Sequence, residues 1–97
     1  MVCSYTFAPL RVPANRRAAV AETMTRINAR LWIGTFELDC SDGTMRVRMN
    51  AGVEDGVLSP RMAARIVHEG ARTWDAYLDV LMAVSHGGVE PAVAVPT

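Results

Sequence analysis

The sequence contains no lysine, and only two cysteines and two histidines among its 97 residues. Ten arginines balance ten acidic residues, so the formal net charge is zero, whereas general nucleic-acid binders and binders of anionic membranes carry a basic excess. Cys3 and Cys40 form neither a disulfide framework nor a Cys-x-x-Cys motif, which favours a reducing compartment. We therefore expect a cytoplasmic protein that binds neither nucleic acid nor membranes.

Long hydrophobic runs are also absent. No stretch approaches the ~18 apolar residues of a transmembrane helix, and the N-terminus lacks the charged-then-apolar plan of a signal peptide. Hydrophobic residues nevertheless make up 51% of the chain, more than a disordered segment carries. A chain of this length forms one small domain with a modest core. We expect this domain at residues 1–88, with a flexible tail at residues 89–97.

The residue types that most often catalyse reactions or bind metals are far apart in the sequence. His68 and His86 have no second ligand nearby in the sequence, whereas a metal site needs three or four converging ligands. A nucleophilic cysteine would need a base and an orienting partner, and no glycine-rich phosphate loop is present. Glu37 and Asp39 lie on one strand face, but each is predicted to face an arginine, which opposes a role as general acid. We expect no enzymatic activity, no metal and no cofactor.

A β-hairpin is predicted at residues 36–49. Asp42-Gly43 is a strong hairpin signal, because both central residues of a type I′ turn need positive φ. With these two residues at the tip, three apolar pairs share one face: Cys40–Met45, Leu38–Val47 and Phe36–Met49. The opposite face carries two charged pairs: Asp39–Arg46 and Glu37–Arg48.

The remaining elements follow from periodicity. Residues 2–8 alternate as a half-buried strand, with Cys3, Tyr5 and Phe7 on one face. Residues 14–30 are typical of a helix with one apolar stripe: Val20, Met24, Ile27 and Leu31. After a loop at residues 51–58, Ser59-Pro60 signals a second helix that runs to about Ser85. Its apolar stripe comprises Met62, Ile66, Trp74, Tyr77, Leu78, Leu81 and Val84. The order β-α-β-β-α predicts an α+β fold, with both helices on the apolar face of an antiparallel sheet.

Several segments across residues 5–84 form a wider pattern: Leu10-Arg11-Val12-Pro13, Arg26-Ile27-Asn28, Gly34-Thr35-Phe36-Glu37-Leu38-Asp39, Asp42-Gly43, Arg46-Val47-Arg48, and Trp74-Asp75-Ala76-Tyr77-Leu78 with Leu81. This pattern resembles the YbjN family. The resemblance implies a bacterial sensory transduction regulator with a fold similar to class I chaperones of type III secretion. In that fold a helix and two strands precede the strand at residues 2–8. Relative to that fold, the N-terminal helix and hairpin are missing from this sequence, either because the chain is a natural short form or because the gene model is truncated.

Two local features suggest an interaction surface. Arg16 and Arg17 occupy the first turn of the first predicted helix, where the helix dipole disfavours cations, and Arg11 is close by. They form either a solvated face or a surface for an acidic patch on a partner. Trp32 lies an even number of residues before Phe36 and Leu38, so in a continuous strand it would point to the same, apolar face. This predicts a core position for Trp32; otherwise Trp32 marks an interface.

The sequence thus predicts a non-enzymatic protein–protein interaction module, a YbjN-like regulator with a chaperone-like role. The alternative is a small-ligand sensor with an apolar pocket near Met24, Trp32 and Trp74. We also expect a two-fold homodimer through the first helix, the unprotected strand at residues 2–8, or both. The chaperones that this fold resembles are homodimers, which implies the same. The candidate interaction residues are Arg11, Arg16, Arg17, Met24, Ile27 and Trp32. The partner, the pathway and any ligand stay open.

Overall fold

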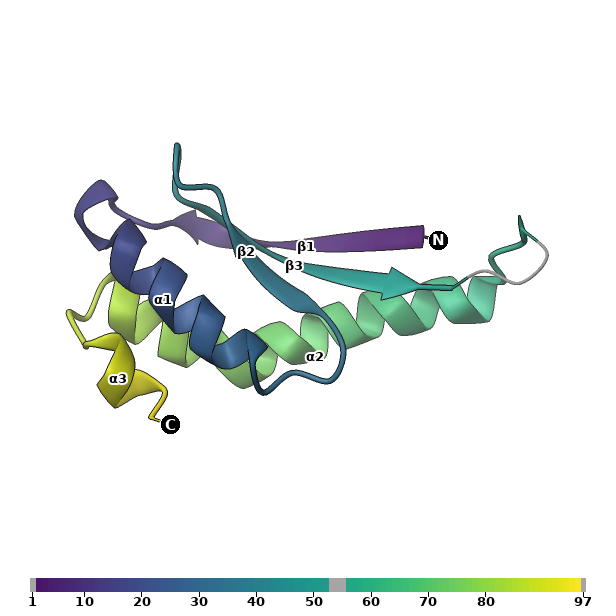
Figure 1. The fold of residues 1–97 in the computed structure, drawn as a ribbon. Helices are drawn as coiled ribbons and strands as arrows, with labels where there is room; N and C mark the ends of the chain where they lie inside the picture. The colour runs from purple at the N-terminus through teal and green to yellow at the C-terminus, as the bar shows by residue number, and fades with distance from the viewer. Residues whose placement is uncertain (1, 53–55, 97) are drawn as a thin grey trace.

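The computed structural model describes residues 2–52 and 56–96. The chain forms, in order, β1 (Val2–Arg11), the short 3-10 helix η1 (Ala14–Arg16), α1 (Arg17–Asn28), β2 (Thr35–Leu38), β3 (Thr44–Ala51), α2 (Pro60–Ser85) and α3 (Pro91–Ala94) (Figure 1). The strands form an antiparallel sheet in the order β1-β3-β2. The predicted α+β class and the order β-α-β-β-α are therefore confirmed. Part of the loop predicted at residues 51–58 lies outside the described residues.

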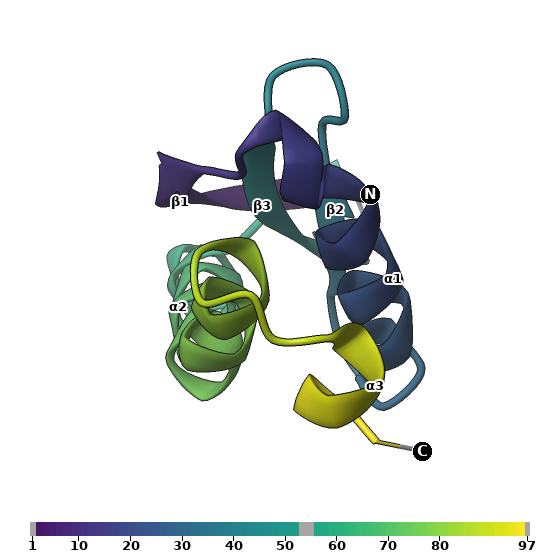
Figure 2. The same cartoon turned by 90° about the vertical axis from the view of Figure 1, so that its left-hand side faces the viewer.

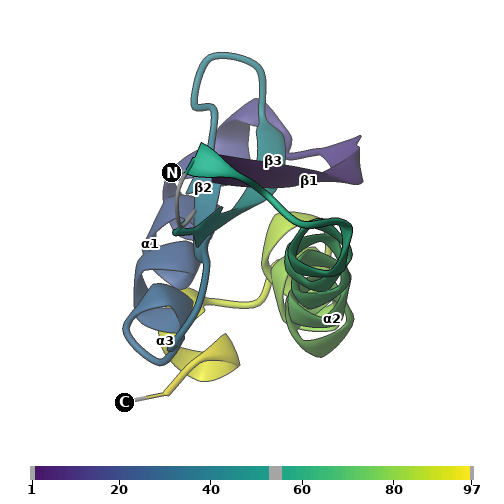
Figure 3. The ribbon, with the colours of Figure 1, turned by 90° about the vertical axis from the view of Figure 1, so that its right-hand side faces the viewer.

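The fold has two layers. The helices α1, α2 and α3 lie on one side of the sheet, with α1 below β2 and α2 below β1 and β3 (Figure 2, Figure 3). The buried core between the layers contains Val12, Val20, Met24, Ile27, Phe36, Met45, Val47, Met49, Trp74, Leu81, Val84 and Val95. In the part of the chain that the structure describes, no helix covers the opposite face of the sheet.

Helix α2 begins and ends where the sequence predicts. Pro60 is its first residue, and the Ser59 side chain accepts a hydrogen bond from the Met62 N–H at 3.2 Å. Trp74 lies in the middle of the sheet-facing stripe and is 7% exposed. Its Nε1 donates to the Thr6 carbonyl at 2.8 Å, and its ring meets Phe36 edge-on with the centroids 5.0 Å apart. Trp74 thus joins α2 to both β1 and β2.

The hairpin register differs from the predicted one by two residues. Leu38 faces Met45 and Phe36 faces Val47, so the predicted pairs are wrong although the apolar face is correct. Residues 40–43 form a four-residue connection, closed by the Asp39 N–H bond to the Thr44 carbonyl at 2.9 Å. The Asp39 carboxylate accepts from the Ser41 N–H at 2.9 Å, which favours this longer turn over a two-residue one. Cys40 consequently lies exposed in the turn.

The predicted orientation of the first strand is wrong. Cys3, Tyr5 and Phe7 lie on the exposed face, and Tyr5 and Phe7 are 45% and 56% exposed. The smaller residues Val2, Ser4, Thr6 and Ala8 point toward the helices. The reason is the close passage of α2, because a Cβ added at Gly70 would lie 2.6 Å from the Thr6 Oγ1. An aromatic side chain does not fit between β1 and this helix.

The segment after α2 is packed, which differs from the expected flexible tail. Pro91–Ala94 form α3, and Val95 is 4% exposed within the core. Side chains from the first helical region donate to backbone carbonyls of this segment: Arg16 to Val89 at 2.8 Å, Arg26 to Val95 at 3.4 Å, and Arg30 to Pro96. These bonds span long sequence separations, and local periodicity does not reveal them.

Candidate functional site

The two edges of the sheet differ. The outer edge of β2 is closed by Asn28, the last residue of α1. The Phe36 N–H donates to Asn28 Oδ1 at 2.8 Å, and Asn28 Nδ2 donates to the Phe36 carbonyl at 3.1 Å. The Asn28 amide therefore stands where a neighbouring strand would pair, and it blocks strand addition at that point. Asn28 belongs to the Arg26-Ile27-Asn28 segment of the YbjN-like pattern, but its role depends on a contact that only the fold creates.

Among residues 2–52 and 56–96, no strand pairs with the outer edge of β1, and we call this the open edge. Because Asn28 takes both backbone groups of Phe36, the Phe36–Val47 pair is a non-hydrogen-bonded pair of the ladder. Val47 must then direct its own N–H and C=O toward Thr6 of β1. By alternation, the β1 residues with outward N–H and C=O groups are Cys3, Tyr5 and Phe7. Within residues 2–52 and 56–96, no hydrogen bond outside the strand ladder uses these backbone groups.

Aromatic and charged side chains share the uncovered face of the sheet. The Arg46 guanidinium lies over the Tyr5 ring, 4.6 Å from its centroid. Glu37 pairs with Arg46 at 2.8 Å and with Arg48 at 3.5 Å, so one carboxylate serves both arginines. Because the register is shifted, Arg46 faces Glu37 and not Asp39, and Arg48 faces Thr35 but still reaches Glu37 as a diagonal neighbour.

A hollow of ≈ 410 Å³ lies at the hairpin end of this face, between Phe7 and Arg46 and the carboxylates of Glu37, Asp39 and Asp42. The Ser41 hydroxyl holds the pKa of Asp39 below its ordinary value by a hydrogen bond. The Thr44 N–H lowers the pKa of Asp42 in the same way. Both groups are therefore ionised at neutral pH, and neither is suited to act as a general acid.

A weakly polar flank of α2 runs beside the open edge. A second hollow of ≈ 220 Å³ lies between β1 and α2, and Ala71, Asp75 and Leu78 form its helix wall. Val67, one turn before Ala71, is 58% exposed. Helix α2 runs below β1 (Figure 2), so the outer edge of β1 lies next to the exposed residues of this flank of α2.

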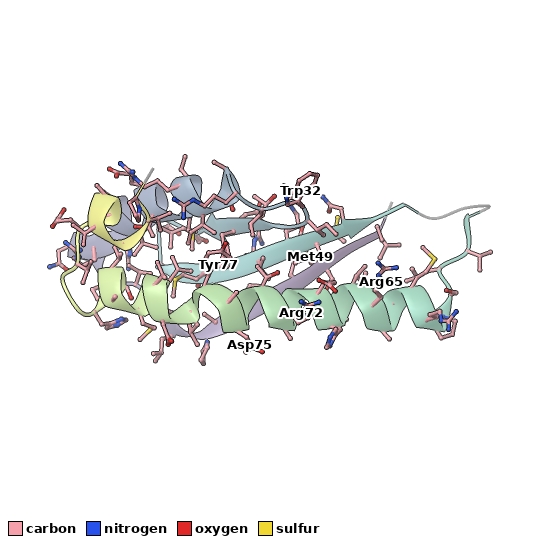
Figure 4. The ribbon with its side chains drawn as sticks, turned by 90° about the horizontal axis from the view of Figure 1, so that it is seen from below. Trp32, Met49, Arg65, Arg72, Asp75 and Tyr77 are labelled. Carbon is pink, nitrogen blue, oxygen red and sulfur yellow. The ribbon has the colours of Figure 1, made fainter. Side chains whose placement is uncertain are left out.

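A separate groove follows the other flank of α2. It has a volume of ≈ 240 Å³, with Ile33, Met49, Met62 and Ile66 among its lining residues. In Figure 4, Met49 lies between the loop that carries Trp32 and helix α2, which carries Arg65 and Arg72. Trp32 is 100% exposed, so its predicted core position is wrong. The chain turns at Gly34, whose φ is +87°, and the strand parity does not continue back through this turn.

Two of the three predicted interaction arginines, Arg16 and Arg17, have partners within the chain. Arg16 Nε donates to the Val84 carbonyl at 2.8 Å, in the last turn of α2, where the helix dipole favours a cation. Arg17 donates to the carbonyls of Val12 at 3.1 Å and Ser41 at 3.3 Å, and so joins the hairpin turn to the β1–α1 connection. Arg11 is exposed at the end of β1.

The apolar candidates of the first helix are buried. Met24 and Ile27 are 3% and 0% exposed and belong to the core of this chain. Met24 and Ile27 are therefore not on the surface of this chain, where a partner could contact them. The predicted ligand pocket is not formed by its three residues, because Met24 and Trp74 pack in the core while Trp32 points into solvent.

The residue types that most often bind metals stay apart in the described part of the chain. His68 and His86 are both exposed, and both cysteines are free and exposed. Within residues 2–52 and 56–96, no three histidine, cysteine, aspartate or glutamate side chains are grouped closely enough to hold a metal ion. In the same residues, no helix has the length and apolar character needed to span a membrane.

A family model, YbjN, described as "Putative bacterial sensory transduction regulator", matches residues 2–82. No curated protein and no solved structure matches the sequence. The family match covers β1, α1, the hairpin and nearly all of α2, and therefore includes both edges of the sheet. The chain belongs to the YbjN family.

Proposed function

We propose that this YbjN-family regulator is a cytoplasmic protein–protein interaction module without catalytic activity, and that it binds an extended polypeptide segment along β1. The contrast between the two sheet edges carries this proposal. Asn28 closes the edge of β2, whereas Cys3, Tyr5 and Phe7 offer outward backbone groups on β1. A fold that protects one edge and leaves the other open presents a specific site for strand addition.

The surroundings of β1 supply the side-chain contacts that such a complex needs. Backbone pairing gives affinity for any extended chain, and neighbouring side chains give selectivity. Tyr5 and Phe7 offer aromatic surface on the outer face, and Arg46 and Glu37 add charges of both signs next to them. A partner strand that alternates apolar and charged residues fits this face. By pairing with such a strand, this chain would cover an exposed segment of another protein, and this is the chaperone-like role that we assign to it.

The test separates backbone pairing from side-chain contact at one position. Tyr5→Ala and Tyr5→Pro both remove the phenol ring, but only proline removes the outward N–H. Because that N–H faces away from β3, proline leaves the β1–β3 ladder intact and is tolerated on an edge strand. Both variants should keep the wild-type circular dichroism spectrum. The tagged wild-type chain and both variants would be used for affinity capture from the native organism, followed by mass spectrometry.

We expect the same proteins to be captured by the wild type and, in reduced yield, by Tyr5→Ala, and to be lost with Tyr5→Pro. Equal capture by Tyr5→Pro would contradict binding along β1. The partner would then be expected to bind in the groove near Trp32 and Met62 instead. Capture of no protein above a tag-only control would contradict the proposed function.

A further inference from the structure

We infer that the surface of α1 and α2 on which residues 89–96 pack is a second polypeptide-binding site, and that a short apolar segment of another protein binds there in place of the chain's own residues. We call residues 89–96 the α3 segment, because they contain α3. The segment contacts α1 and α2, on the side of α1 that faces away from the sheet (Figure 2, Figure 3). This site is separate from β1, so the inference goes beyond the proposed function.

The α3 segment is held by its backbone. The side chains of Arg16, Arg26 and Arg30 donate to three of its carbonyls, which lie at both ends of the segment. Hydrogen bonds from a charged donor are stronger than those between neutral groups. Because every residue type carries a backbone carbonyl, these bonds hold a polypeptide without selecting its sequence. A segment of another protein offers the same carbonyls to the same three arginines.

Two side chains of the α3 segment determine which sequences fit. Pro91 and Val95 are buried, and Val95, at 4% exposed, belongs to the core. Val93, between them, is 73% exposed. Glu90 is exposed and lies 3.9 Å from Arg16, so this ion pair contributes little. The site therefore accepts a segment with two apolar residues four positions apart, the spacing of neighbours on one face of a helix.

The way in which the α3 segment is attached allows it to leave. Helix α3 has four residues, and a helix of this length is unstable on its own, so the segment is ordered only while it is docked. Gly88 joins the segment to the end of α2 with φ +70°, and a Cβ added there would meet no atom of the described residues within 4 Å. Packing therefore does not fix this link, and glycine permits it to change conformation.

The α3 segment does not fill the surface on which it lies. A hollow of ≈ 340 Å³ remains beside Val95 and Pro96, and Thr25, Ala29 and Arg30 of the first helical region are among its lining residues. A segment of another protein that also enters this hollow makes contacts that the α3 segment does not make. The family match ends at residue 82, so the α3 segment lies outside the part of the chain that this match covers.

The first test asks whether the α3 segment opens by itself. The N–H groups of Ala94 and Val95 donate to carbonyls within the segment at 3.0 and 2.9 Å, so they exchange with solvent only when α3 opens. In hydrogen exchange of the wild-type chain followed by NMR, they should exchange at least ~10-fold faster than the amide of the buried Leu81 in α2. Equal rates would show that the segment opens only when the whole domain unfolds, which would overturn the inference.

The second test measures binding of a free segment. A fluorescein-labelled, end-capped peptide with the sequence of residues 89–96 is titrated with the full chain and followed by fluorescence anisotropy. Because the chain's own segment is tethered at an effective concentration of ~1 mM, the peptide competes poorly with it in the wild type. Val95→Asp releases the tethered segment, because it would bury an unpaired charge. Val93→Asp is the matched control, since Val93 is exposed.

We expect the peptide to bind the Val95→Asp chain at least ~10-fold more tightly than the wild type or the Val93→Asp chain. The same peptide with Val95→Asp should not bind. In the Val95→Asp chain, Arg26→Ala should weaken peptide binding by ~3–10-fold through the lost carbonyl bond. Arg65→Ala, on the exposed surface of α2, should leave it unchanged.

A Val95→Asp chain that keeps the wild-type circular dichroism spectrum but does not bind the peptide would overturn the inference, as would equal binding to the Val93→Asp chain. If Val95→Asp does not fold, hydrogen exchange of the wild type decides. Adding Tyr5→Pro to Val95→Asp should not change peptide binding, because β1 is separate from this surface. Failure of this inference is therefore distinct from failure of the proposed function.

Discussion

Replacing Trp74 with alanine is the most direct test of how α2 is held to the sheet. The indole is 7% exposed, contacts the Phe36 ring edge-on at 5.0 Å and donates to the Thr6 carbonyl at 2.8 Å. Removing a buried aromatic side chain costs ~3–5 kcal/mol, and the lost hydrogen bond adds ~1 kcal/mol. We therefore expect Trp74→Ala to lower the free energy of unfolding by ~4–6 kcal/mol.

This loss is large for a chain of this size. Typical stabilities of ~0.05–0.15 kcal/mol per residue give ~5–15 kcal/mol for 97 residues. At ~4–8 °C per kcal/mol, the melting temperature should fall by at least ~16 °C, and the variant is close to unfolding at room temperature. Trp74→Phe keeps a ring against Phe36 but lacks the N–H, and should cost only ~1–2 kcal/mol.

Chemical denaturation followed by far-UV circular dichroism measures both variants on the same scale. Trp32 is fully exposed, so Trp32→Phe should be nearly neutral. In that background Trp74 is the sole tryptophan, and its fluorescence should shift to longer wavelength on unfolding. A double-mutant cycle with Phe36→Leu should give a coupling of ~0.5–1.5 kcal/mol. If Trp74→Ala unfolds within ~1 kcal/mol of its parent, the indole does not hold α2 to the sheet and the reasoning is refuted.

Three further predictions concern the hairpin and the closed edge. Gly43 has φ +81°, and a Cβ added there would lie 2.2 Å from the Val12 carbonyl oxygen. Gly43→Val should therefore lower the free energy of unfolding, measured by denaturant titration, by ~1–3 kcal/mol, and Gly43→Ala should lower it by less. Asn28→Leu leaves both backbone groups of Phe36 unpaired, which should cost ~1–3 kcal/mol and, by opening a second edge, should produce larger species in light scattering. The pKa of Asp39 is lowered in the folded state, so its stabilising contribution is present above the ordinary aspartate pKa and is lost as the pH falls through the folded value. Carbon-13 NMR titration of Asp39 should show this lowered pKa, and Ser41→Ala should raise it toward the ordinary value.

The sequence by itself determined the three strands, the two longer helices and most of the core. Ser59 and Pro60 mark the start of α2 because an N-cap oxygen and a proline suit the unpaired first turn. The apolar stripes of both long helices and the apolar face of the hairpin follow from periods of 3.6 and 2 residues, which depend only on local geometry. The resemblance to the YbjN family rested on these same segments, and it is confirmed over residues 2–82.

Register and orientation were decided by contacts that no local pattern contains. The alternation of β1 defines two faces, but the close passage of Gly70 decides that the small residues around Thr6 turn inward and that the aromatic residues stay outside. The hairpin keeps its apolar face under a shift of two residues, so hydrophobic pattern alone does not distinguish the two registers. The Ser41 bonds to Asp39 and the docking of Gly43 on Val12 select the observed one.

The candidate site depended on tertiary structure almost entirely. Arg16 and Arg17 conflict with the dipole of their own helix, and the fold resolves this by directing them to carbonyls far along the chain. Asn28 and Phe36 are eight residues apart, yet their pairing decides which sheet edge is closed. Every strand residue carries the same backbone N–H and C=O groups, so the sequence does not show which of these groups are paired. Whether a sheet edge is open or closed is decided only by the strand order and by the side chains and helices that lie next to that edge.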